Sequence, residues 1–229
     1  MKTSSLALFD LDHTLLPIDS DRSWGQFLSD IGVVDRERYQ QRNDEFYGHY
    51  QAGTLNMHEF LRFALAPLAA HSRAQLDIWH EQFMQQIVKP ALYSSAFALV
   101  EQHRTQGDMC AIVTATNSFV ARPIAHAFGI DTLIATELAT VDGSPHANFN
   151  GHVVGMPSFR EGKIIRTEQW LNGLGLNWES FEKVYFYSDS INDLPLLEKV
   201  NMPIATNPDP ALRATAQAKN WSIIDLFSS

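Results

Sequence analysis

The sequence contains a single cysteine, Cys110, so an internal disulfide bond is excluded. It also lacks any run of lysine and arginine: 17 basic residues stand against 26 acidic ones, and the formal net charge is −9. This balance argues against nucleic acid or an anionic membrane as the main partner. An acidic protein that acts on anionic phosphates would need a cation at its active site.

Long apolar segments are also missing. Residues 1–5 lead directly into a short apolar run without the features of a secretory signal, and no segment is long enough to cross a bilayer. We therefore expect a cytoplasmic protein with no membrane partner. A chain of 229 residues, 45% of them hydrophobic, is long enough for one domain and a small second one.

Short apolar runs recur along the chain, at residues 6–9, 111–113, 133–135, 184–187 and 203–205. Runs of this kind are typical of strands that are buried on both faces. Helical patterns lie between them, and Gly107 and Gly129 are placed where helices would end. The alternation predicts an α/β fold, a Rossmann-like parallel sheet with helices on both faces.

Residues 18–89 interrupt this alternation. They contain no convincing strand, but apolar residues recur at helical spacing, as in Trp24, Phe27, Leu28 and Ile31. We expect these side chains to form the core of a helical bundle and not a cofactor site. The predicted organisation is a Rossmann-like core of residues 1–17 and 90–229 with an inserted all-helical cap domain of residues 18–89. A hairpin is predicted within residues 138–154.

Four polar patches follow the predicted strands or lie in nearby loops. Each patch alone has an ordinary explanation, such as a helix cap, a turn residue or a solvated lysine. Together they fall at the carboxyl edge of one parallel sheet, where such folds build their sites. Converging carboxylates repel one another unless a divalent cation holds them, and oxygen ligands without nearby thiols favour Mg²⁺. The patches are Asp10 and Asp12; Thr114 and Thr116; Lys163; and Asp189, Ser190, Asn192 and Asp193.

With these motifs the sequence resembles the haloacid dehalogenase superfamily of phosphatases, in particular the branch that contains phosphoserine phosphatases and histidinol-phosphate phosphatases. The resemblance rests on the DxDxT motif of residues 10–14, Thr114, the Gly162-Lys163 pair and the DxxxD motif of residues 189–193. It extends to Asn207-Pro208-Asp209-Pro210. It implies a Mg²⁺-dependent phosphatase that hydrolyses a small phosphorylated metabolite.

The resemblance also implies roles for these residues. Asp10 is the expected nucleophile, which forms an aspartyl-phosphate, and Asp12 the expected general acid and base. Thr114 and Lys163 are expected to bind the phosphoryl oxygens. The implied metal ligands are Asp10, Asp189 and Asp12, the last through its backbone carbonyl. Asp193, Asn192, Ser190 and Thr116 would support them.

The substrate is left open by the sequence. Asp19 matches the position at which phosphoserine phosphatases use an acid to bind the substrate amine. Ala64 stands where an arginine for the substrate carboxylate is expected, and the neighbouring Arg62 is either a substitute or a surface charge. Histidinol phosphate and other small amine-bearing esters are therefore candidate substrates together with phosphoserine.

Other functions fit part of the pattern. A receiver-like signalling module also uses acid, hydroxyl and lysine on a parallel sheet, but needs neither Asp12 nor a helical lid. A phosphomutase or phosphotransferase on the same fold would not release free phosphate. A non-catalytic binding protein would not need every chemical position intact.

Overall fold

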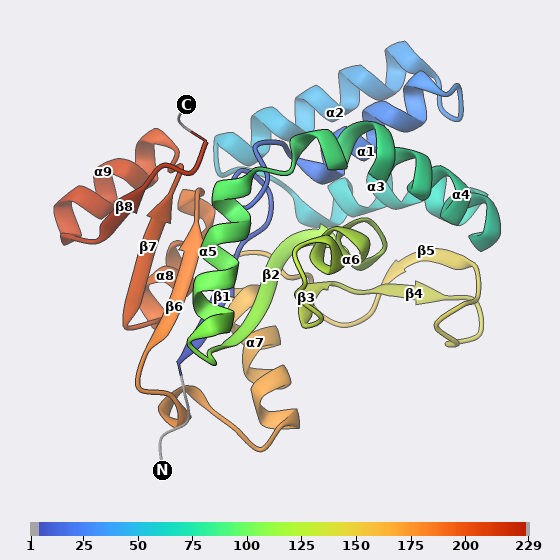
Figure 1. The fold of residues 1–229 in the computed structure, drawn as a ribbon. Coiled ribbons are helices and arrows are strands. Elements are labelled where there is room, and N and C mark those ends of the chain that lie inside the picture. Colours follow the sequence, from blue (N-terminus) through green and yellow to red (C-terminus); the bar gives the residue numbers. More distant parts are fainter. Residues whose placement is uncertain (1–4, 228–229) are drawn as a thin grey trace.

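The structure is a computed structural model that describes residues 5–227. Within these residues, six parallel strands form one sheet in the order β3-β2-β1-β6-β7-β8, and β4 and β5 form a separate hairpin (Figure 1). The strands are β1 (Leu6–Phe9), β2 (Met109–Asn117), β3 (Leu133–Thr136), β4 (Leu138–Thr140), β5 (Phe149–Val153), β6 (Val184–Ser188), β7 (Met202–Thr206) and β8 (Ser222–Ile224). The helices are α1 (Ser20–Asp30), α2 (Arg36–Gln51), α3 (Met57–Ala70), α4 (Arg73–Phe83), α5 (Ser94–Thr105), α6 (Ser118–Ala127), α7 (Glu161–Gly173), α8 (Leu194–Lys199) and α9 (Pro210–Lys219). Short helical turns are η1 (Met84–Val88), η2 (Lys89–Ala91), η3 (Trp178–Ser180) and η4 (Ile191–Asp193).

The central strand β1 is buried on both faces, as its continuous apolar sequence predicts. Ala7 and Phe9 belong to one hydrophobic cluster, which includes Val100 of α5. Leu6 and Leu8 point to the opposite face, into a second cluster built with α7, α8 and α9. Helices therefore cover both faces of a parallel sheet, and the predicted fold class is confirmed.

All five predicted strands are present, and the predicted hairpin is the antiparallel pair β4–β5. Gly107 and Gly129 follow α5 and α6 with φ values of 76° and 70°, as helix-ending glycines do. The edge strand β8 was not predicted, because its three residues make too short an apolar run.

The helices α1 to α4 follow β1 and lie together above the sheet (Figure 1). Trp24 of α1 packs against the rings of Phe27 and Phe83, and also against Phe119 of α6. The aromatic residues of this insert are thus core residues, as expected. One hydrophobic cluster runs from these helices into the sheet, so the division at residues 18 and 89 stays a prediction.

No helix in the described part of the chain is both long and apolar enough to span a membrane.

Candidate active site

Asp10 follows β1 at the carboxyl edge of the sheet. Its backbone N–H donates to the carbonyl of Tyr187 on β6 at 2.9 Å, which continues the sheet pairing by one residue. The chain then turns tightly, and the amides of Leu15 and Leu16 donate to the Leu11 carbonyl. This turn returns Thr14 to the vicinity of Asp10: the distance from Thr14 Oγ1 to Asp10 Oδ2 is 3.5 Å. The Asp10 side chain is only 8% exposed.

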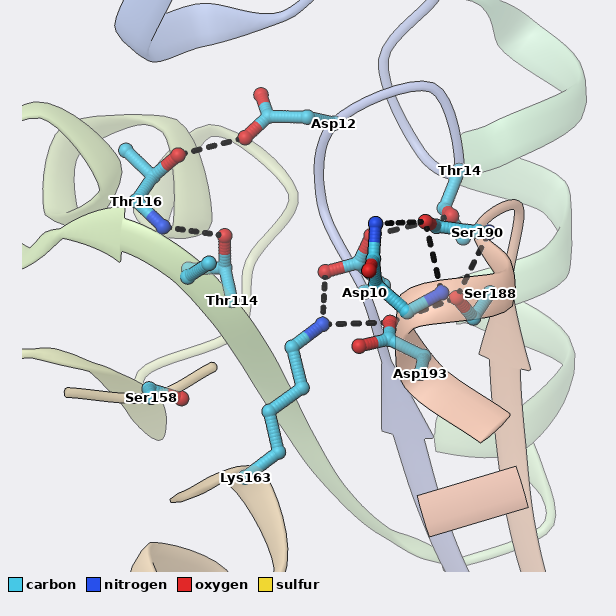
Figure 2. A network of polar contacts seen from close by, with 12 residues as sticks. Asp10, Asp12, Thr14, Thr114, Thr116, Ser158, Lys163, Ser188, Ser190 and Asp193 are labelled. Atoms are coloured by element: carbon cyan, nitrogen blue, oxygen red, sulfur yellow. Dashed lines mark hydrogen bonds and ion pairs between the residues drawn. The ribbon is translucent and has the colours of Figure 1, made fainter. Parts of the chain in front are cut away.

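Lys163, in the first turn of α7, reaches across the sheet edge to two carboxylates (Figure 2). Its Nζ lies 2.7 Å from Asp10 Oδ1 and 2.6 Å from Asp193 Oδ2. Ser188 Oγ also donates to Asp193 Oδ2, at 2.7 Å. Burial alone lowers the pKa of Lys163, but Asp10 and Asp193 outweigh it and raise the pKa above its ordinary value. The ammonium therefore stays charged and fixes both acids.

Negative charge nevertheless exceeds positive charge at this edge. Thr14 Oγ1 lies 3.2 Å from Asp189 Oδ1, so Asp189 joins Asp10 around one hydroxyl. Burial raises the pKa of Asp10 to about 7, although Lys163 opposes the shift. Burial, together with Asp10 and Asp193, raises the pKa of Asp189 well above its ordinary value. Three buried carboxylates share one ammonium, an arrangement that a divalent cation would stabilise.

These residues fit a Mg²⁺ ion in charge and in ligand chemistry, because all the donors are oxygens. Among residues 5–227, however, no group of three or more acidic, histidine or cysteine side chains is arranged to hold a metal. The side chain of Asp12 is engaged elsewhere. Its oxygens accept hydrogen bonds from the Ser20 amide at 2.7 Å and Thr116 Oγ1 at 2.6 Å. The fit therefore depends on two side chains, Asp10 and Asp189, with the Asp12 contribution limited to its backbone.

The hydroxyls of Thr114 and Thr116 at the end of β2 are not helix caps. Asn117 caps α6 instead, because its side chain accepts from the Val120 amide at 3.1 Å. The Thr116 amide donates to Thr114 Oγ1, and Thr116 Oγ1 contacts Asp12 (Figure 2). Both threonines line the same cavity as Asp10, so their hydroxyls can reach a phosphate group bound there.

The loop after β6 is braced by residues to which the sequence assigned no role. The Asp209 amide donates to the Asp189 carbonyl at 2.7 Å, and its carboxylate accepts from the Ile191 amide at 2.8 Å. Asn207, with a φ of 47°, donates to the carbonyls of His13 and Thr14 at 2.9 and 3.2 Å. These contacts join the loops that carry the two acidic motifs.

A cavity of about 70 Å³ lies between this edge and the helical insert. The sheet side contributes Asp10, Asp12, Thr114, Thr116, Lys163 and Asp193. The insert contributes an aromatic wall and two acids: Phe46, Tyr47, Tyr50, Phe60, Asp19 and Asp21. The structure thus brings the predicted catalytic residues together with Asp19, and adds Asp21, which the sequence did not indicate.

Asp19 and Asp21 start α1 and face the cavity. Asp19 is its N-cap and accepts from the Arg22 amide at 2.8 Å, whereas Asp21 accepts from Asn117 Nδ2 at 2.9 Å. Burial and the nearby Asp12 raise the pKa of Asp19 to about 6. Burial, followed by Asp19 and Asp12, raises the pKa of Asp21 to about 8. An acid at a helix start is usually read as a cap, which is why Asp21 gave no functional signal.

Arginines are scarce around this acidic end. Arg22 lines the cavity, but it pairs with Asp44 and lies over the ring of Tyr47 at 4.6 Å. Arg62 is exposed on α3 and is not among the residues that line the cavity. The predicted substrate contact of Arg62 therefore has no support from its position, and we do not propose it.

The comparisons with known proteins agree with this geometry. A family model described as haloacid dehalogenase-like hydrolase matches residues 7–198. A histidinol-phosphatase of Neisseria meningitidis serogroup C is 42% identical over 221 residues, which cover 96% of this chain and 98% of the relative. Phosphoserine phosphatase SerB1 of Mycobacterium tuberculosis is 29% identical, over 97% of this chain and 71% of the relative.

Solved structures give a similar result. A crystal structure of a protein of unknown function from Bordetella pertussis Tohama I has a TM-score of 0.92 and 51% identity, and covers 98% of this chain and 100% of that one. A phosphoserine phosphatase, solved as a phospho-aspartyl intermediate analogue, has a TM-score of 0.64 and 19% identity, over 98% of this chain and 94% of that one. The second likeness shows a shared fold.

Proposed function

The chain belongs to the haloacid dehalogenase-like hydrolase family, and we propose that this phosphatase forms its phosphorylated intermediate on Asp10 with Mg²⁺ as cofactor. The main support is the Asp10 carboxylate, which is held by Lys163 at 2.7 Å and lines the cavity. A carboxylate fixed in this way can attack phosphorus without a general base to activate it.

In the first step an Asp10 oxygen attacks the phosphorus atom, and the bond from phosphorus to the ester oxygen breaks. Asp12 gives its proton to the departing oxygen. Thr116 Oγ1 can accept a hydrogen bond from the protonated Asp12 and donate one to the ionised form, so the 2.6 Å contact suits both states. Lys163 and Thr114 offer donors to the phosphoryl oxygens, where negative charge grows in the transition state.

In the second step water attacks the aspartyl-phosphate, and Asp12 takes the proton of that water. Free phosphate leaves and Asp10 is restored. Asp10, Asp189 and the backbone carbonyl of Asp12 would hold Mg²⁺, which supplies positive charge to the phosphoryl oxygens when bound. Asp193 orients Lys163 and is itself held by Ser188.

For the substrate, we propose a small phosphate ester whose organic part carries positive charge. Asp19 and Asp21 line the same cavity as the phosphate-binding groups, with Asp12 close to both, and Arg22 is already paired with Asp44. A substrate carboxylate, as in phosphoserine, would meet the Asp19 carboxylate there, and Arg22 is not free to bind it. Histidinol phosphate, which the 42% identical relative is named for, is the first candidate.

Phosphate release tests this function. Metal-free protein is supplied with histidinol phosphate, phosphoserine or an aryl phosphate, before and after addition of Mg²⁺. We expect release only with Mg²⁺, with histidinol phosphate ahead of phosphoserine. Transfer of the phosphoryl group to a second metabolite without free phosphate would instead support the phosphotransferase alternative. A stable phosphoprotein without turnover would support the receiver-like alternative.

A further inference from the structure

Arg160 has a backbone conformation that residues with a side chain rarely adopt. Its φ is 51° and its ψ is −120°, a region that glycine enters freely. It occupies the N-cap position of α7, but its side chain does not cap the helix. Because the helix itself gains nothing from this side chain, contacts with other segments must offset the backbone strain at Arg160.

The guanidinium group of Arg160 makes these contacts, since it binds two separate segments. Nη2 donates to the carbonyl of Gly53 at 2.6 Å. Nη2 and Nε both donate to Asn192 Oδ1, at 3.0 and 3.2 Å. The group also lies 5.0 Å from the ring centroid of Phe159. In the described part of the chain it forms no ion pair with an acid, so its hydrogen bonds all go to neutral oxygens.

These contacts tie the helical insert to the loop that carries the second acidic motif. Gly53 follows α2, whereas Asn192 lies between Asp189 and Asp193 in sequence. Asn192 makes a further link, since its Nδ2 donates to the carbonyl of Tyr50 at 3.1 Å. We call Arg160, Asn192 and the carbonyls of Tyr50 and Gly53 the Arg160 clasp.

We propose that Arg160 is a positioning residue that couples the placement of Lys163 to the closure of α2 over the cavity. The Lys163 amide donates to the Arg160 carbonyl at 3.0 Å, so the two residues share the first turn of α7. Tyr50 and Phe159, which flank the clasp, both line the cavity. When α2 is in place, the clasp holds the start of α7, and with it the ammonium that binds Asp10. The kinetic consequence of this coupling rests on the proposed function.

Hydrogen exchange tests the clasp without reference to activity. The variants are Arg160→Gly, which suits the backbone but removes the side chain, and Arg160→Lys, which keeps the charge but cannot bind both segments as a planar fork. Arg166→Lys is the matched control, because Arg166 lies on the same helix and donates to the carbonyls of Val154 and Met156, outside the insert. We expect amides 52–54 to exchange roughly tenfold faster or more in both Arg160 variants, and to be unchanged in the control.

Two results would overturn the proposal. One is wild-type exchange at amides 52–54 in both Arg160 variants. The other is a uniform acceleration along the whole chain that follows a lower melting temperature, which would make Arg160 merely a stabilising residue. If Arg160→Gly does not fold, the comparison of Arg160→Lys with Arg166→Lys still decides between these outcomes.

Kinetics then tests the coupling to Lys163. With the Arg160 variants, kcat for a substrate that fills the cavity should fall roughly tenfold or more, with partial recovery in Arg160→Lys relative to Arg160→Gly. An unchanged kcat alongside altered exchange would overturn the coupling. Absence of phosphatase activity in the wild-type protein would contradict the proposed function instead, and the exchange result would still stand.

Discussion

At the scale of single residues, Lys163 determines how the acids of the candidate site coexist. It binds Asp10 and Asp193 at 2.7 and 2.6 Å while its own side chain is almost fully buried. A buried charge left without its partner is strongly unfavourable, whereas a satisfied pair contributes little net stability. We therefore expect this ion pair to position groups more than to stabilise the fold. It holds one oxygen of the Asp10 carboxylate in place and leaves the other near Thr14.

Asp12 is the residue whose role is most open to direct test. Asp12→Asn retains the nucleophile but removes the proton donor of the first step and the base of the second. General acid–base assistance is typically worth ~10²–10⁴ in rate, and alkyl phosphates with poor leaving groups depend on it most. With an aryl phosphate and Mg²⁺, this variant should show a burst of phenol and accumulate phosphate on Asp10, as measured by rapid-quench mass spectrometry.

Asp10→Asn is the control for that experiment and should form no phosphoprotein with any ester. Phosphate on another residue of Asp12→Asn, or equal rate losses for alkyl and aryl esters, would contradict the assignment.

Residues of the candidate site differ in how visible they are in the sequence. Asp10, Thr114 and Asp193 could be predicted because each stands directly after, or close to, the end of a buried apolar run. Asp21 and Arg160 could not. An acid in the first turn of a helix is usually explained by the helix dipole, and a positive φ at an arginine leaves no trace in a single sequence.

At the scale of elements, helices with a clear apolar stripe could be predicted and α2 could not. Only Asn43 and Phe46 of its 16 residues are buried, so the helix shows almost no amphipathic pattern. Its remaining face is divided between solvent and the cavity, to which it presents Tyr47 and Tyr50. Among the helices that line the site, α2 is thus the one whose sequence is least typical of a packed helix.

The loops that follow β1 and β6 support a prediction about metal binding. Mg²⁺ added to metal-free protein should raise the melting temperature, because an ion held only by the folded state stabilises it. At a concentration 100 times its Kd the gain is about 2.7 kcal/mol. Asp189→Asn should abolish the shift, whereas Asp142→Asn, which changes an exposed acid in the hairpin turn, should keep it. An equal melting temperature with and without Mg²⁺ would argue against the ion.

The junction between α4 and α6 predicts a pH dependence of stability. His80 is 4% exposed, and its Nε2 lies 3.1 Å from the Val120 carbonyl. Burial lowers the pKa of His80 from 6.5 to about 4, although the hydrogen bond to Val120 and the charge of Asp77 oppose the shift. Because the folded-state pKa lies below the unfolded one, the stabilising contribution is complete above pH 6.5 and is lost as the pH falls toward 4.

His80→Gln separates this effect from that of the other titrating groups, since glutamine can donate the same hydrogen bond but carries no proton equilibrium. Between pH 7 and pH 5 the wild-type protein should lose about 2 kcal/mol of unfolding free energy relative to His80→Gln, as measured by urea denaturation. Parallel curves for the two proteins would show that His80 does not stay neutral in the fold.

At the scale of the whole molecule, a net charge of −9 repels any anionic substrate at long range. Phosphoserine carries a carboxylate that histidinol phosphate lacks, so long-range repulsion and contacts inside the cavity both disfavour it, and a test has to separate the two effects. The cavity is lined by one ammonium, Lys163, which binds Asp10, and by two further acids, Asp19 and Asp21, at the start of α1. This set of groups fits an ester that carries both a phosphate and a protonated amine.

Asp21→Asn tests whether that local pattern selects the substrate. Loss of this acid from the start of α1 should lower kcat/KM for histidinol phosphate roughly tenfold or more, and should leave phosphoserine unchanged or improved. Glu45→Gln is the matched control, because it makes the same change in formal net charge, from −9 to −8, but lies exposed on α2 and is not among the residues that line the cavity. If both variants alter the two substrates equally, net charge and not the Asp21 contact accounts for the preference. A change in substrate ranking confined to Asp21→Asn would locate the selectivity at the start of α1.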